Sequence, residues 1–249
     1  MRIVENNASD NVETLGPAAP LQVPAPDDDL ALWLCPLIVS AERMRAFEAT
    51  LSPAEHARRE RFGTQALRER YVAGRGTLRV LLAAELGTEP AAVVIVRGER
   101  GRPRLDGNAA GADFNVSHTR DVALIGILRL PHGRARIGVD IEHDERAVGA
   151  DRLAARYLAP GERDRLAGLG SEERRRRFIR LWTAKEAMSK ATGDGLRAPL
   201  GMLDVDLEPE PRLVAGPAPY APADWRLIDA RLPFGFVGTV ARWEAAAPR

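Results

Sequence analysis

The chain has 249 residues and a formal net charge of +1, a length that fits one large domain or two ordinary ones. A charge so close to zero gives no support for a nucleic-acid-binding protein, and no apolar run reaches the length of a membrane span. Cys35 is the single cysteine, so an internal disulfide is excluded and a reducing compartment fits best. We therefore expect a cytoplasmic protein that has neither a membrane nor a nucleic acid as its partner.

The first half of the chain predicts a tail followed by mixed helices and strands. Residues 1–29, rich in Ala, Pro, Asn and Asp, predict a disordered tail. Ser52 as N-cap, Pro53 at the first helical position and Glu55 as the third helical residue predict a helix that starts with a capping box. Apolar periodicity predicts a helix over residues 67–86, ended by Gly87, and strands over 31–39, 93–97, 114–116 and 122–130.

The second half repeats this order of elements. Ala159-Pro160-Gly161-Glu162 predicts another helix start, and Gly193 ends a long predicted helix over residues 172–192. A long helix beside a small sheet thus occurs twice. The other predicted elements are a helix over 152–158 and strands over 137–141, 203–207, 225–229 and 236–242.

These elements predict an α+β fold of two pseudo-symmetric subdomains. Each subdomain is a long helix packed on a small, mostly antiparallel sheet, and the active cleft lies between the two. The predicted boundaries are a tail over 1–29, an N-terminal subdomain over 30–133 and a C-terminal subdomain over 134–249, joined near residues 131–136.

The basic side chains are distributed unevenly. Arginine supplies 34 of them, whereas the two lysines, Lys185 and Lys190, lie near Glu186 in one predicted helix. Lysine offers a compact point charge and arginine a planar fork, so the switch suggests charge chemistry at one place; two ordinary cations on an exposed helix are the alternative. Residues 43–104 carry thirteen arginines against seven acidic residues, and such a patch attracts phosphates.

Three carboxylates are candidates for a metal site. Asp140 and Glu142 lie two residues apart on a predicted strand, so both project to one face while Val139 and Ile141 enter the core. Glu186 adds a carboxylate from the long helix, and an all-oxygen ligand set suits Mg²⁺. On its own, an Asp-x-Glu pair is more often part of an ordinary half-exposed strand.

Other side chains near these carboxylates could bind phosphate. Lys190 follows Glu186 by one helical turn and Lys185 precedes it directly, so a magnesium ion flanked by two ammonium groups would clamp a pyrophosphate; a surface Glu–Lys pair is the alternative. Ser117 and His118 end a predicted strand, and a lone Ser-His pair is more often a capping or packing feature. No Gly-x-Ser-x-Gly elbow surrounds the serine. Cations on the basic helices, each a solvated charge by default, are Arg58, Arg61, Arg70 and Arg75.

Two segments in order along the chain resemble the signature pair of the 4′-phosphopantetheinyl transferases. They are IGVDIE at residues 137–142 and RLWTAKEAMSKATGDGL at residues 180–196. FNVSHT at 114–119, GRP at 101–103 and the helix over 68–83 are similar to the longer, two-domain Sfp-type members. The resemblance covers about residues 50–200, where arginine replaces some of the family's lysines on the nucleotide side.

This resemblance implies an activity. The family transfers the 4′-phosphopantetheine arm of coenzyme A to a serine of an apo acyl or peptidyl carrier protein, and it releases adenosine 3′,5′-bisphosphate. Its two-domain members are generally monomers, so we expect a monomer. The implied ligands of Mg²⁺, or of Mn²⁺, are Asp140, Glu142 and Glu186, and the implied contacts to coenzyme A are Arg58, Arg70, Arg102, Ser117, His118, Lys185 and Lys190.

The implied catalytic residues are Glu186, Lys185 and Asp140, with Glu186 taking the proton of the incoming serine directly or through a metal-bound water. Two other functions remain open. A non-catalytic module that binds coenzyme A or a carrier protein would keep the basic patch without the metal. A metal-dependent phosphodiesterase or nuclease would also place acids beside lysines, although the near-neutral charge disfavours it.

Overall fold

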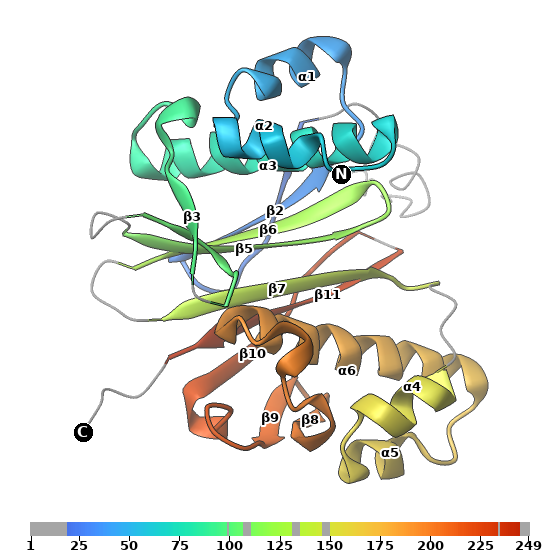
Figure 1. Cartoon of the computed structure of the whole chain (residues 1–249). Coiled ribbons are helices and arrows are strands. Elements are labelled where there is room, and N and C mark those ends of the chain that lie inside the picture. Colours follow the sequence, from blue (N-terminus) through green and yellow to red (C-terminus); the bar gives the residue numbers. More distant parts are fainter. Residues whose placement is uncertain are drawn as a thin grey trace, which may run out of the picture.

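The computed structural model describes residues 19–98, 100–106, 111–130, 135–145, 150–233 and 235–244. Predictions for residues 1–18 of the tail and for residues 131–134 of the joint lie outside these ranges. Within them the elements form four layers in the order helices, sheet, sheet, helices (Figure 1). Each half is a long helix on an antiparallel sheet, which confirms the predicted α+β class. Across the described ranges, no helix combines the length and the apolarity that a membrane crossing requires.

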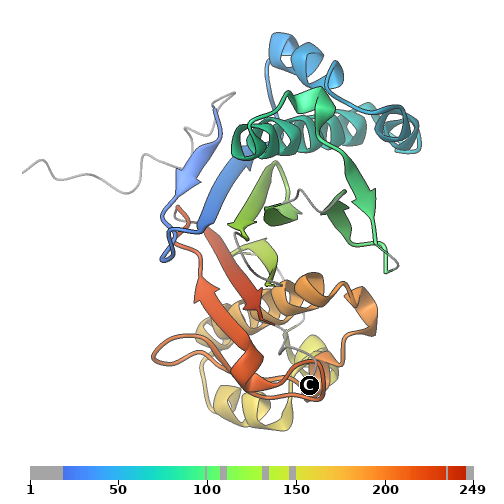
Figure 2. The ribbon, with the colours of Figure 1, turned by 90° about the vertical axis from the view of Figure 1, so that its left-hand side faces the viewer.

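The N-terminal half contains a four-stranded antiparallel sheet in the order β1-β2-β6-β5. The long helix α3 covers one face of this sheet, and the shorter helix α1 lies beyond it (Figure 1). A separate hairpin, β3–β4, runs beside the sheets from the α3 layer toward the second half (Figure 2). The bounds are β1 Leu21–Val23, β2 Leu30–Pro36, α1 Ala41–Glu48, α2 Pro53–Arg59, α3 Gln65–Leu86, the 3₁₀ helix η2 Pro90–Ala92, β3 Ile95–Arg97, β4 Pro103–Leu105, β5 Ala112–Thr119 and β6 Val122–Arg129.

The C-terminal half contains a three-stranded antiparallel sheet in the order β10-β11-β7. Its long helix α6 packs on this sheet, with α4 and α5 on the outer side (Figure 1). The bounds are β7 Arg136–His143, α4 Ala150–Tyr157, α5 Pro160–Leu166, α6 Ser171–Thr192, the 3₁₀ helices η3 Gly195–Arg197, η4 Leu200–Met202 and η5 Pro222–Asp224, and strands β8 Asp204–Asp206, β9 Arg212–Ala215, β10 Trp225–Asp229 and β11 Phe236–Trp243.

The ends of the helices follow the predicted sequence signals. Ser52 and Glu55 form the predicted capping box at the start of α2, which satisfies backbone N–H groups that a helix start leaves unpaired. Gly87 and Gly193 end the two long helices in the left-handed conformation, at φ 63° and 80°, which a side chain with a Cβ disfavours. Local residue chemistry therefore fixes where α2, α3 and α6 stop or start.

An apolar layer between the two sheets joins the halves. Leu32 and Leu124 come from the first sheet, Val139 and Ile141 from β7, and each is at most 1% exposed. Val139 and Ile141 therefore enter the core as the period-two pattern predicts. The opposite faces of the sheets pack against α3 and α6 in separate clusters, so β7 is covered on both sides.

The predicted extent of the tail is wrong at its C-terminal end. Leu21–Val23 pair with β2 as strand β1, and Val23 is 3% exposed. Asp27 and Asp29, which suggested disorder as acidic residues, instead form ion pairs with Arg226 and Arg242 of the C-terminal half. Charge pairing across 199 and 213 residues of sequence holds this segment, and local composition does not reveal it.

Candidate functional site

Three of the predicted site residues meet where the halves touch. Lys190 on α6 donates from Nζ to Asp140 Oδ1 on β7 at 2.6 Å and to Ser117 Oγ on β5 at 2.7 Å. The Ser117 hydroxyl also donates to Asp140 Oδ1 at 2.7 Å. Asp140 is 4% and Ser117 6% exposed, and charge-assisted contacts are strong where water is largely excluded. The structure therefore assembles a cation, a carboxylate and a hydroxyl from three elements.

A glycine on β7 lets α6 come this close. A Cβ at Gly138 would overlap the carbonyl oxygen of Ala187, so any larger residue would push the helix away from the strand. Side chains on a strand alternate between its faces, so the face of Gly138 is also the face of Asp140 and Glu142. Both carboxylates therefore belong to the face of β7 that α6 covers, and Glu186 belongs to α6.

The chemistry of the predicted metal ligands fits a hard cation. Asp140 Oδ2 is buried without a hydrogen-bond partner among the described residues, whereas Oδ1 is covered by Lys190. A buried carboxylate oxygen in this state is suited to a divalent cation with oxygen ligands. Over the part of the chain that the structure describes, however, no three carboxylate, imidazole or thiol side chains gather closely enough to form a ready metal site. Metal binding by Asp140, Glu142 and Glu186 together stays a prediction.

Lys185 does not reach this cluster, which corrects its predicted contact with coenzyme A. Its side chain is 0% exposed, and Nζ donates to Glu162 Oε2 at 2.5 Å, Leu200 O at 2.8 Å and Tyr157 O at 2.9 Å. An ammonium has three N–H donors, so none is left for a phosphate. Neighbouring helix residues project about 100° apart, which turns Lys185 away from the direction of Glu186. The predicted direct role of Lys185 in catalysis is therefore not supported.

Burial dominates the electrostatics of this lysine and its partner. Desolvation lowers the pKa of Lys185 and raises the pKa of Glu162, and the attraction between the two opposes both shifts. Each group is therefore kept in the core by the other. Removal of one partner would leave a buried charge without compensation, which is strongly destabilising.

Arg102 is also engaged within the protein rather than directed to a ligand. Its Nη1 and Nη2 atoms form a bidentate pair with Asp113 at 2.9 and 2.7 Å. Nη2 also donates to Ile137 O at 2.7 Å, and Nε donates to Lys190 O at 3.0 Å. Its side chain is 10% exposed. Arg102, which directly precedes β4 in the β3–β4 hairpin, thus links this hairpin to β5, β7 and α6. These contacts take the place of the coenzyme A contact that the resemblance implied.

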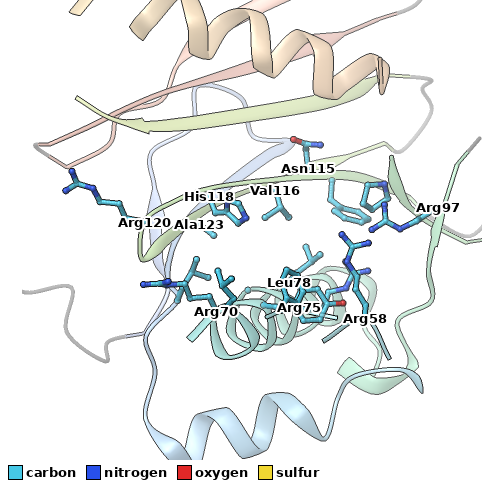
Figure 3. Close-up of a pocket in the computed structure, with 17 residues that line it drawn as sticks. Arg58, Arg70, Arg75, Leu78, Arg97, Asn115, Val116, His118, Arg120 and Ala123 are labelled. Carbon is cyan, nitrogen blue, oxygen red and sulfur yellow. The ribbon is translucent and has the colours of Figure 1, made fainter. Parts of the chain in front are cut away.

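A pocket of about 380 Å³ lies between α3 and β5 in the N-terminal half (Figure 3). Its floor is apolar, with Leu78 and Val116 facing each other across it (Figure 3). Basic side chains from α2, α3, β3 and the β5–β6 turn surround the opening. They are Arg58, Arg70, Arg75, Arg97 and Arg120, together with His118.

The arginines of this pocket exceed their acidic partners. Arg70 pairs with Asp121 at 2.6 Å, and Arg75 pairs with Glu55. Within the described ranges, Arg58 and Arg120 have no ion pair. Burial, followed by repulsion from Arg58 and Arg75, lowers the pKa of Arg97. Cations that repel each other beside an apolar floor favour a bound anion with an apolar part.

The pocket holds further polar groups suited to an anion. The Tyr71 hydroxyl is buried without a hydrogen-bond partner among the described residues, and burial raises its pKa. Arg120 has a positive φ of 46°, which is uncommon for a residue other than glycine. The sequence analysis named Arg58, Arg70, Arg75 and His118, which line this pocket, and it missed Arg97 and Arg120. The signal it overlooked was their position, since Arg97 ends a strand and Arg120 directly follows the Ser-His-Thr strand end.

Comparisons with known proteins cover both halves. A model described as the 4′-phosphopantetheinyl transferase superfamily matches residues 136–235, and one described as 4′-phosphopantetheinyl transferase, N-terminal, matches residues 39–127. The 4′-phosphopantetheinyl transferase HetI of Nostoc sp. is 37% identical over 206 residues, which is 81% of this chain and 82% of the relative. A putative 4′-phosphopantetheinyl transferase of Synechocystis sp. is 35% identical over 70% of this chain and 69% of the relative.

A more distant relative extends the same likeness. The 4′-phosphopantetheinyl transferase Sfp of Bacillus subtilis is 25% identical over 68% of this chain and 72% of its own length. The ordered motifs, the two α+β halves and these relatives agree. The chain belongs to the 4′-phosphopantetheinyl transferase superfamily.

Proposed function

We propose that this protein transfers the 4′-phosphopantetheine arm of coenzyme A to a serine hydroxyl of an apo carrier protein and releases adenosine 3′,5′-bisphosphate. One structural relationship carries the proposal. The arginine-lined pocket includes His118 on β5. Ser117, the residue directly before it on the same strand, is hydrogen-bonded to Lys190 and Asp140. An anion pocket beside a cation and a carboxylate supplies the positioning and charge neutralisation that phosphoryl transfer requires.

The pocket would hold the adenosine bisphosphate end of coenzyme A. Arg58 has no ion pair among the described residues and Arg97 is crowded by like charge, so an incoming phosphate would relieve repulsion. His118 is exposed at the pocket and suits the 3′-phosphate. The apolar floor of the pocket suits the adenine ring of coenzyme A. With this end of coenzyme A in the pocket, the pyrophosphate would extend toward Ser117 and Lys190.

Asp140, Glu142 and Glu186 are proposed to hold Mg²⁺, for which the unpartnered Asp140 Oδ2 is the supporting observation. When bound, a divalent cation neutralises charge on the pyrophosphate. Lys190 keeps Asp140 and Ser117 together and offers an ammonium from the same side. Mn²⁺ meets the same oxygen-ligand requirement.

The reaction balances without a covalent intermediate on the enzyme. The carrier serine oxygen forms a bond to the phosphorus that carries pantetheine, and the bond from that phosphorus to the oxygen of the bisphosphate breaks. Glu186 is the proposed acceptor of the serine proton, which then passes to solvent. In this proposal the enzyme contributes position and charge rather than a covalent intermediate.

We further propose that the enzyme is a monomer, because both halves of the site lie in one chain. We also propose a cytoplasmic location, because a chain with a single cysteine fits a reducing compartment. The test is intact-mass spectrometry of apo carrier proteins from fatty-acid, polyketide and non-ribosomal peptide systems after incubation with the enzyme, coenzyme A and Mg²⁺. We expect one phosphopantetheine to be added, and the addition to stop with EDTA. Coenzyme A binding without any mass gain on any carrier would instead indicate a non-catalytic binding module.

A further inference from the structure

The two halves share a buried ion pair in corresponding positions. In each half a short helix begins with proline at its first position, and its third residue is a buried glutamate that accepts from the N–H of the residue before the proline, Ser52 at 2.8 Å in one half and Ala159 at 2.7 Å in the other. That glutamate pairs with a cation in the long helix that follows. The pairs are Glu55 with Arg79, 24 residues apart, and Glu162 with Lys185, 23 residues apart. This recurrence is independent support for the pseudo-symmetric fold.

In the N-terminal half the pair is built around a guanidinium. Arg79 Nε donates to Glu55 Oε2 at 2.8 Å, and Nη1 donates to Pro90 O at 2.8 Å and Val93 O at 3.0 Å. Arg79 is 2% exposed and Glu55 is 6% exposed. The arginine therefore fastens α3 to the start of α2 and to the segment before β3. It contributes nothing to the lining of the pocket.

In the C-terminal half the same connection is made by an ammonium. Lys185 fastens α6 to Glu162 and to the carbonyls of Tyr157 and Leu200, and both charged side chains are 0% exposed. Glu162 is also held by backbone N–H groups, since Oε2 accepts from Ala159 at 2.7 Å and Oε1 accepts from Val205 at 2.9 Å. One carboxylate thus ties α5, α6 and the start of β8 together.

We infer that Lys185 and Glu162 are positioning residues that set the placement of α6, and through it the placement of Glu186, rather than groups that contact coenzyme A. This inference rests on the proposed function, because it concerns the third proposed metal ligand. Lys185 immediately precedes Glu186, so the turn of helix that carries the carboxylate is the turn that the buried pair fixes. Gly138 on β7 leaves no spare room for α6 to shift inward.

The inference also explains why lysine occurs here in an arginine-rich chain. Three acceptor oxygens surround Nζ, and an ammonium supplies three donors. A guanidinium has five donors in a planar fork, so arginine at this position would bury donors without partners. The acceptors around Arg79 are spaced so that different nitrogens of one planar guanidinium reach them, and arginine therefore fits at that position.

The test compares three variants with a matched control. Lys185→Met keeps the length of the stem, Glu162→Gln keeps the shape of the carboxyl, and the double variant carries no lone buried charge. The control is Arg79→Met, which removes the corresponding cation in the other half. For each, we would measure the Kd of coenzyme A without metal, the Kd of Mn²⁺ with coenzyme A by electron paramagnetic resonance, kcat, and Tm.

We expect each single variant to weaken Mn²⁺ binding about tenfold, as loss of an outer support of a metal ligand typically does. The double variant should bind Mn²⁺ no more weakly than the single variant that binds it less tightly, since the two residues act as one unit. The Kd of coenzyme A should change less than about twofold, which is within the variation of neutral changes. Arg79→Met should lower Tm and leave Mn²⁺ binding unchanged.

Two results would overturn the inference alone. One is a loss of coenzyme A affinity in Lys185→Met that Glu162→Gln does not share, because this indicates direct phosphate contact. The other is unchanged Mn²⁺ affinity in the folded double variant. A wild-type protein that modifies no carrier would overturn the proposed function, and this inference with it.

Discussion

Lys190 Nζ lies 2.6 Å from Asp140 Oδ1, so the second lysine of the chain bonds one of the predicted metal ligands directly. The same ammonium lies 2.7 Å from Ser117 Oγ on the other half. The contact joins the two halves at the place where the proposed pyrophosphate would lie. Asp140 keeps its second oxygen buried and without a partner among the described residues, which leaves room for a further cation.

Lys190→Arg should lower kcat about tenfold or more while the charge is retained, because the larger, planar guanidinium does not fit the place of the compact ammonium and would change the contacts to Asp140 and Ser117. Carrier loading measured at saturating coenzyme A and Mg²⁺ would show this loss, and the Tm would show that the fold persists. Full activity in this variant would mean that only a positive charge is needed at the position.

His118→Ala should raise the Kd of coenzyme A about tenfold, as loss of a charge-assisted contact to phosphate typically does. The Kd of dephospho-coenzyme A should stay nearly the same, since that ligand lacks the 3′-phosphate. Titration calorimetry with both ligands makes the comparison. An equal loss for the two ligands would remove His118 from the 3′-phosphate contact.

Arg58→Met should weaken the binding of coenzyme A without lowering the Tm of the ligand-free protein. In the free pocket Arg58 repels Arg97 and has no ion pair among the described residues, so its loss removes repulsion. The affinity should fall about tenfold and depend less on salt. A lower Tm in the free variant would show that Arg58 stabilises the fold.

Cys35 should resist alkylation in the native protein at pH 8. It is 0% exposed, and burial raises its pKa to about 12, so both access and thiolate are lacking. Labelling with iodoacetamide across a urea series should follow global unfolding. Rapid labelling in the absence of urea would show that the core around β2 opens locally.

Patterns that act over a few residues predicted much of this molecule. The period of two placed Asp140 and Glu142 on one face of β7, and the helix signals located Ser52, Gly87 and Gly193 at helix ends. These features depend on neighbours in the chain, so the sequence displays them directly.

Features that depend on distant partners escaped prediction. The burial of Lys185 depends on Glu162 and Leu200, which approach it only after folding. Arg102 likewise finds Asp113 and the Ile137 carbonyl through the tertiary structure. A resemblance transfers the identity of a residue, but its contacts are set by the charges and cavities around it in this chain.

The most direct measurement is the intact mass of an apo carrier protein incubated with coenzyme A, Mg²⁺ and either the wild-type enzyme or Asp140→Asn. We expect the wild type to add one phosphopantetheine to the carrier and to leave a carrier whose acceptor serine is alanine unchanged. Asp140→Asn should lose at least about two orders of magnitude in rate, in line with loss of a group that stabilises charge in the transition state, while its Tm stays close to that of the wild type. Transfer by Asp140→Asn at the wild-type rate would contradict the assignment of this site.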